Sequence, residues 1–167
     1  IAIIVAFVLL AQGLYDGVTS GNILGTEAQV TTAGLLAATN SAQVEKGAKP
    51  LANNAQLAAT AKLKVRNMFD KQYWAHTAPD GTAPWHWFGK VGYAYADAGE
   101  NLAKNFTTSD STVSAWLASP THRANVLKAE YQDVGFAVMS GMLGDKPTTL
   151  IVALYGTPDQ ATVQGAA

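Results

Sequence analysis

The feature that most constrains the fold of this chain is a change in residue pattern, from helical spacing in its middle part to β runs near its end. Residues 134–140 and 148–155 are rich in β-branched and aromatic residues, which favour strands. The intervening segment GMLGDKP predicts a hairpin with its turn at Gly144 and Asp145. Because helical segments precede this hairpin and no βαβ unit repeats, the order indicates an α+β fold rather than a doubly wound sheet.

The segments before the hairpin carry apolar residues at helical spacing, bounded by capping residues, glycine or proline. Helices are expected at residues 32–46, 53–71, 84–89 and 109–118, and a further strand at residues 101–103. Ser109 or Asp110 is expected to cap the last of these helices. Ser119 and Pro120 then either end that helix or open another short turn.

Helical spacing also predicts which side chains face inward. In the first helix Leu35, Leu36, Thr39 and Val44 are assigned to the buried side. In the second helix Lys62, Lys64, Arg66 and Lys71 lie mostly off the apolar stripe and are assigned to the solvated side.

The N-terminal residues 1–14 read IAIIVAFVLLAQGL and contain no charged residue. So apolar a run is expected to form a helix that anchors the chain in a membrane, as the outer part of a truncated transmembrane helix, although a full span needs about 20 residues. A signal-peptide remnant and a helix that packs against partner helices in a filament or complex are alternatives. Residues 15–31 are rich in Gly and small polar residues and are expected to be a linker, followed by a domain at 32–157 and a tail at 158–167.

The composition excludes several functional classes. A formal net charge of -1 and 14% charged residues provide no basic field for nucleic acid, so no nucleic-acid partner is expected. The chain has no cysteine, which excludes disulfides, thiolate metal sites and a cysteine nucleophile. It also lacks a G-x-S-x-G element, which argues against Ser114 or Ser119 as a hydrolase nucleophile.

His76, Glu100 and His122 lie beside loop elements that contain Gly, Pro or Asn, where side chains often converge on clefts. Two imidazoles and one carboxylate suit a divalent ion such as zinc, with a fourth position for water or substrate. Without metal, the same three groups can act as general acid and base. The plainer alternative is that the histidines tie loops to backbone carbonyls and that Glu100 accepts loop hydrogen bonds.

Four segments, in this order, resemble the bacterial branch of the CAP superfamily, also called SCP-like, which is related to cysteine-rich secretory, antigen 5 and pathogenesis-related proteins. The resemblance covers roughly residues 32–157. The segments are Thr39-Asn40 followed by KPL at 49–51, YWAHTAPDG at 73–81, GENLA at 99–103, and WLASPTHRANVL at 116–127 running into VGFA at 134–137.

The resemblance implies an α-β-α sandwich in which a small antiparallel sheet of about three strands lies between helices. It also implies a cleft, since the family's tetrad of two His and two acidic residues is matched by His76, Glu100 and His122. At the fourth place this chain has Ser119, which cannot supply a charge. Asp80 or Glu130 would compensate only if the fold brought either of them near.

A second departure is Trp85-His86-Trp87, where bacterial relatives often carry Trp-Asp-Arg. Asp80, Trp85, His86 and Ser119 are therefore expected at the rim of the cleft. Arg123 and Asn125 are interpreted as scaffolding that satisfies backbone carbonyls.

The favoured function is a binding or interaction module rather than an enzyme. It would be anchored in a membrane, face the outside of the cell, need no cofactor, and hold a lipid, glycan or other cell-envelope ligand. One alternative is a metal-dependent hydrolase acting on peptide or envelope polymer, with His76 and His122 as zinc ligands and Glu100 activating water. Another is a subunit of a surface filament or membrane complex assembled through residues 1–14.

Overall fold

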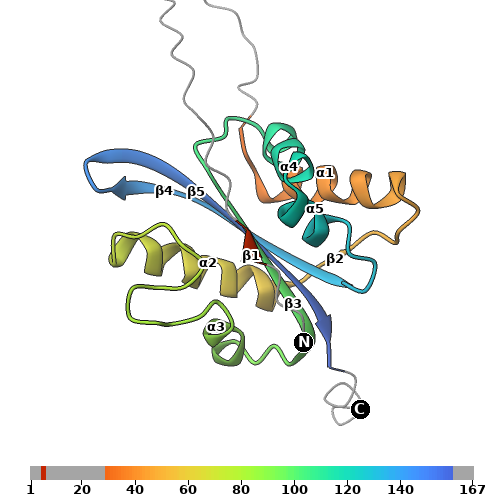
Figure 1. The fold of residues 1–167 in the computed structure, drawn as a ribbon, viewed down its shortest axis with the longest axis horizontal. Coiled ribbons are helices and arrows are strands. Elements are labelled where there is room, and N and C mark those ends of the chain that lie inside the picture. The colour runs from red at the N-terminus through yellow and green to blue at the C-terminus, as the bar shows by residue number, and fades with distance from the viewer. Residues whose placement is uncertain (1–4, 7–28, 160–167) are drawn as a thin grey trace, which may run out of the picture.

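A computed structural model describes residues 5–6 and 29–159 and shows a sheet between two layers of helices (Figure 1). The sheet order is β1-β3-β5-β4-β2. Three long strands, β3 (Tyr95–Lys104), β5 (Lys146–Pro158) and β4 (Asp133–Leu143), pair antiparallel in its centre. The two-residue strands β1 (Val5–Ala6) and β2 (Ala52–Asn53) add parallel to its edges.

Strand β5 explains why both faces of the sheet need a covering layer. Its residues 150–155, LIVALY, are all fully buried and alternate between the two hydrophobic cores. Leu150, Val152 and Leu154 pack toward α2 (Ala55–Asp70) and α3 (His86–Lys90). The alternate residues, Ile151, Ala153 and Tyr155, pack on the other side, toward α1 (Thr32–Glu45), α4 (Ser109–Ala118) and α5 (Pro120–Val126).

Short polar side chains fix where the helices begin. Thr31 accepts a hydrogen bond from the backbone N–H of Gly34 at the start of α1, and Asn54 accepts two at the start of α2. The cap of α4 is Thr108, one residue before the two candidates predicted from the sequence. The hydroxyl of Ser109 instead receives the backbone N–H of Thr31 at 3.1 Å, which ties the start of α4 to the start of α1.

The α+β class and the α-β-α sandwich expected from the sequence are confirmed, as is the hairpin with its turn at Gly144 and Asp145. The strand expected at 101–103 is longer and forms β3. Ser119 and Pro120 open α5 rather than only ending α4.

Two inward-or-outward assignments were wrong. Val44 is 58% exposed, because α1 buries the stripe of Leu35, Thr39 and Ala42, and Val44 lies outside it. Lys64 is 1% exposed, because it lies on the same stripe of α2 as Leu57, Ala61 and Met68. The second error concerns the functional site directly.

The predictions for the chain ends fall largely outside the described residues. Val5 and Ala6 form β1, which pairs with Glu100 and Asn101 of β3. The remaining parts of the predicted anchor helix (1–14), of the linker (15–31) up to residue 28, and of the tail (158–167) from residue 160 lie outside the description. In the part of the chain that is described, no helix is long and apolar enough to cross a membrane.

Candidate functional site

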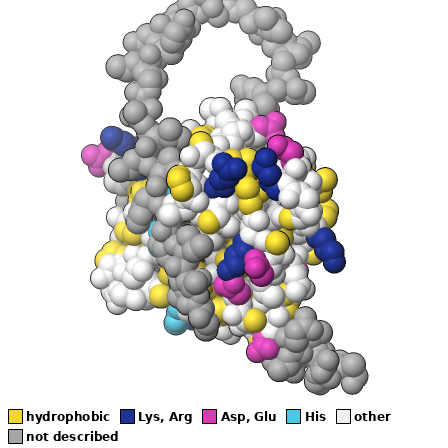
Figure 2. Space-filling view, turned by 45° about the vertical axis from the view of Figure 1, so that its right-hand side comes forward, with side chains coloured by type: hydrophobic (Ala, Val, Ile, Leu, Met, Phe, Trp, Pro, Cys, Tyr) yellow, Lys and Arg dark blue, Asp and Glu magenta, His cyan; other side chains and the backbone are white. Residues whose placement is uncertain are grey.

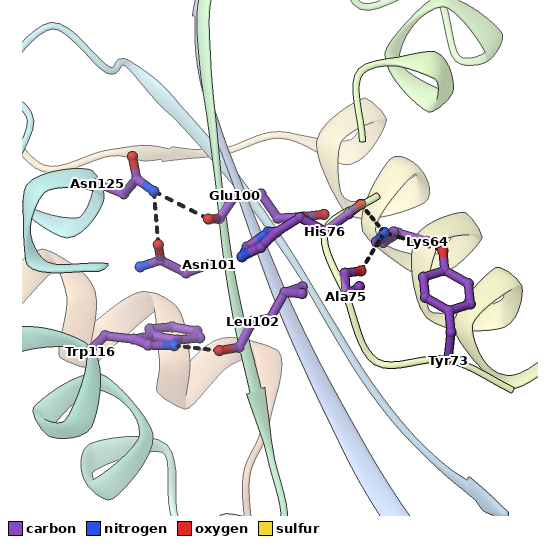
Figure 3. Close-up of polar contacts among 9 residues, drawn as sticks. All are labelled: Lys64, Tyr73, Ala75, His76, Glu100, Asn101, Leu102, Trp116 and Asn125. Atoms are coloured by element: carbon purple, nitrogen blue, oxygen red, sulfur yellow. Dashed lines mark hydrogen bonds and ion pairs between the residues drawn. The ribbon is translucent and has the colours of Figure 1, made fainter. Parts of the chain in front are cut away.

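The candidate site is organised by strand β3, whose successive side chains point to opposite faces of the sheet. Glu100 points toward the α2 side, where its Oε1 lies 2.6 Å from Nδ1 of His76 (Figure 3). His76 belongs to the loop that follows α2. The two side chains are 3% and 0% exposed, so this pair is buried.

Lys64 of α2 holds the loop that carries His76. Its ammonium donates to the backbone carbonyls of Ala75, at 2.9 Å, and of His76, and to the hydroxyl of Tyr73 at 3.2 Å (Figure 3). The Tyr73 hydroxyl in turn donates to Oδ1 of Asn67 at 2.7 Å. A single buried lysine therefore anchors the backbone of the loop on which His76 lies.

Burial and nearby charges oppose each other in shifting the pKa of Lys64 but act together on that of Tyr73. Desolvation lowers the pKa of Lys64, and the negative charge of Glu100 partly offsets that effect. Burial raises the pKa of Tyr73 to about 12, with further contributions from the charges of Glu100 and Asp80. The charge of Glu100 thus influences the pKa values of both Lys64 and Tyr73.

On the opposite face of β3, Asn101 belongs to a network of uncharged groups. Asn125 of α5 donates to the backbone carbonyl of Glu100 at 3.2 Å and to Oδ1 of Asn101 at 2.9 Å (Figure 3). Asn101 donates to the carbonyl of His122 at 3.1 Å. This confirms the scaffolding role expected for Asn125, whereas Arg123 is exposed.

Gly99 is needed beside this network. A Cβ at position 99 would collide with the Tyr131 hydroxyl and with Oδ1 of Asn125. The packing of α5 against β3 therefore depends on the absence of a side chain there.

His122 reaches β3 by a different route from His76. Its backbone carbonyl meets Asn101, while its Nδ1 lies 2.9 Å from Oγ of Ser119 at the start of α5. His122 is fully buried. The fold therefore brings His76 and His122 to adjacent residues of one strand. The ring of His76 meets the side chain of Glu100, whereas the backbone carbonyl of His122 meets the side chain of Asn101.

The backbone edge of β3 is also occupied by side chains. The carbonyl of Glu100 accepts from Asn125, and that of Leu102 accepts from Nε1 of Trp116 at 3.2 Å. Carbonyls two residues apart on a strand point to the same edge, which here is the edge opposite β5, where β1 adds only two residues. Side chains of α4 and α5 thus cap this edge next to the site.

The structure shows no preformed cluster of metal ligands among the described residues. Within residues 5–6 and 29–159, no group of three His, Asp or Glu side chains is placed to hold a metal ion. Nδ1 of His76 is engaged with Glu100, and Nδ1 of His122 with Ser119, so Nε2 is the ring atom through which either histidine would bind a metal. Zinc ligation by His76 and His122 stays a prediction.

One oxygen of the site still needs a donor. Oε2 of Glu100 is buried and has no hydrogen-bond partner among the residues that the structure describes. Buried carboxylate oxygens are normally hydrogen-bonded, so this atom is a natural acceptor for a group that enters the site.

The four predicted rim residues are found in different surroundings. Ser119 contacts His122 directly. Trp85 packs with Phe88 and Tyr95, at ring-centroid distances of 5.8 and 6.4 Å. His86 is exposed and meets Trp87 edge-on.

Asp80, the fourth rim residue, pairs with Lys71 on the surface, and the hydrogen bond from Lys71 holds the pKa of the Asp80 carboxyl well below its usual range. Glu130, the other candidate for the missing carboxylate, is exposed. Of Asp80, Glu130 and Ser119, it is Ser119 that contacts His122 in the described part of the chain.

Lys64 is the site residue that sequence reasoning missed. A usable signal was present, because residue 64 falls at helical spacing between the apolar positions 57, 61 and 68.

Comparisons with known proteins agree with this architecture. The family model described as the cysteine-rich secretory protein family, CAP, matches residues 36–155. The chain is 35% identical over 97 residues to YkwD of Bacillus subtilis (strain 168), a match that spans 58% of this chain and 38% of YkwD.

Two solved structures share the fold. One is an extracellular protein containing an SCP domain from Bacillus anthracis, with a TM-score of 0.64 and 22% identity, covering 75% of this chain and 39% of that one. The other is an outer surface protein from Borrelia burgdorferi, with a TM-score of 0.64 and 21% identity, covering 75% of this chain and 90% of that one.

The fold and the His/Glu pair define an SCP-like sandwich domain. The match over residues 36–155 places the chain in a family, and it belongs to the cysteine-rich secretory protein (CAP) family, although it contains no cysteine. This confirms the resemblance inferred from its motifs.

Proposed function

We propose that this chain is a binding module that works outside the cytoplasm, with the His76–Glu100 pair at the centre of its ligand site. The observation that carries the proposal is the buried Oε2 of Glu100, which lacks a hydrogen-bond donor among the described residues. A hydroxyl or amide N–H of a ligand would satisfy it. Glycans and peptides of the cell envelope carry both groups, whereas the hydrocarbon of a lipid carries neither.

The rigidity of the surroundings supports binding. Lys64 donates a hydrogen bond to the backbone carbonyl of His76, and Asn125 donates one to the backbone carbonyl of Glu100. A site whose groups are fixed before the ligand arrives loses little conformational entropy on binding. Ser119 at the fourth tetrad position supports binding rather than hydrolysis, because it offers no charge to a metal or a water nucleophile.

Two further observations support the proposed location. The similar structures include a protein described as extracellular and another described as an outer surface protein. The uncharged character of residues 1–14 supports attachment to a membrane through the part of this run outside Val5 and Ala6, which pair with β3.

The ligand proposal is tested by sedimentation of isolated cell-envelope polymer with the full chain. Glu100→Gln, which replaces the acceptor Oε2 by an amide, is expected to bind about tenfold more weakly, roughly the loss of one charged hydrogen bond. Glu130→Gln, an exposed glutamate in the same domain, is the matched control and should bind like the unaltered chain. Unchanged binding by a folded Glu100→Gln protein would refute the site.

The attachment proposal is tested separately by fractionating cells that produce the chain with and without residues 1–14. The shortened chain should leave the membrane fraction. Retention there would show that residues 1–14 do not anchor the protein.

A further inference from the structure

Lys64 is buried beside the His76–Glu100 pair, and its hydrogen bonds define its charge. Its Nζ contacts the carbonyls of Ala75 and His76 and the hydroxyl of Tyr73. The carbonyls can only accept, and the Tyr73 hydroxyl gives its proton to Oδ1 of Asn67. All three partners of Nζ are therefore acceptors, which requires three N–H groups and hence an ammonium ion.

This ammonium cannot neutralise Glu100 by direct contact, since its three N–H groups are already used. It acts on Glu100 through space, and this attraction partly offsets the lowering of the Lys64 pKa by burial. His76 lies between them, with its carbonyl on Lys64 and its ring on Glu100. One positive and one negative charge therefore flank His76, and the buried site is close to neutral before any ligand enters.

We propose that Lys64 is a built-in cation that excludes divalent metal ions from the His76–Glu100 site. A divalent ion bound at the imidazole or at Oε2 of Glu100 would meet the fixed ammonium in a buried, weakly screened region. The negative charge of Glu100, which would attract the ion, is already offset by the positive charge of the Lys64 ammonium. The inference concerns the charge of the site and holds whether or not the proposed envelope ligand is correct.

The experiment is a calorimetric titration of zinc into the full chain, kept in mild detergent. It compares the unaltered protein with Lys64→Met, Lys64→Gln and Lys62→Met. Lys62 is an exposed lysine of the same helix and serves as the matched control. Lys64→Gln removes the charge but keeps two N–H groups for the carbonyls of Ala75 and His76, so it is the variant that best preserves the fold.

The unaltered chain and Lys62→Met should bind zinc equally weakly. Both Lys64 variants should bind at least about tenfold more tightly, and His76→Ala in the Lys64→Gln background should abolish the gain. Two results would overturn the inference. One is micromolar binding by the unaltered chain that disappears in His76→Ala; the other is Lys64→Gln, with a cooperative thermal transition, binding no better than the unaltered chain.

Discussion

On the α2 side of β3, Glu100 meets a histidine and the field of a buried lysine, whereas on the α5 side Asn101 meets only amides and backbone carbonyls. Both groups of side chains are buried at the same level of one strand. Charged groups in a buried region depend on each other over a distance, while neutral hydrogen bonds depend on their direct partners. The two sides should therefore respond differently to substitution.

Figure 2 shows that on the outer surface lysine or arginine and acidic side chains lie close together, without one sign of charge covering the displayed face.

The largest effect is expected on the charged side. Lys64→Met should lower the free energy of unfolding by about 3–5 kcal/mol, because it leaves Glu100 buried without a compensating charge and two carbonyls without a donor. Chemical denaturation measures this loss.

The same measurement on a double variant tests whether the loss is electrostatic. Adding Glu100→Gln to Lys64→Met should cost at least about 1 kcal/mol less than Glu100→Gln alone, since the buried negative charge is then already unpaired. Additive losses would mean that Lys64 acts only through its hydrogen bonds.

A smaller, local effect is expected on the neutral side. Asn125→Ala should cost about 2–3 kcal/mol, because the carbonyl of Glu100 and Oδ1 of Asn101 both lose a donor. Here the loss should be the same in the Glu100→Gln background, within about 0.5 kcal/mol. A strong dependence on the charge of Glu100 would contradict the division between the two sides.

Tyrosine titration sharpens the comparison. Glu100→Gln should lower the pKa of Tyr73 from about 12, because the charge of Glu100 contributes to its elevation. The pKa of Tyr155 on the other side is raised by its complete burial and by Tyr131, and it should not change. NMR of tyrosines labelled at Cζ would resolve the two groups.

The raised pKa of Tyr73 also predicts the direction of a stability change. A neutral tyrosine is favoured in the folded state, so this contribution is complete below pH 10 and is lost as the pH rises from about 10 to about 12. Tyr73→Phe should weaken the decrease in stability over that range. An unchanged pH profile would show that Tyr73 does not titrate with unfolding.

The smallest effect is expected at the surface ion pair. Asp80→Asn removes the partner of Lys71, but both side chains are largely exposed, so solvent screens the pair. The melting temperature should stay unchanged within error in a calorimetric scan. A clear decrease in the melting temperature would show that Asp80 stabilises the fold through its loop.

The sequence predicted those elements whose stability comes from local pattern. The hairpin was evident from two β runs around Gly144 and Asp145, and α2 from its apolar spacing. The cap of α4 was misplaced because Ser109 is used in a contact with Thr31, 78 residues away, that no local pattern reveals.

The site was predictable in part for a similar reason. The motifs identified His76 and Glu100, whose contact spans 24 residues along the chain, only because they resemble a known family. The position of Lys64 was misjudged because it was placed off the apolar stripe of α2, and its acceptors come from a loop whose path depends on tertiary packing. The short strands β1 and β2 carry too few residues for any periodicity.

The side chains that cap β3 have a consequence for how the protein behaves in a crowded compartment. An open strand edge is a template on which a second copy, or a misfolded neighbour, can add its own strand and start aggregation. Trp116 and Asn125 occupy the acceptors of Leu102 and Glu100 along that edge. The same contacts that hold the site in place therefore make this stretch of β3 a poor template for a strand from another molecule.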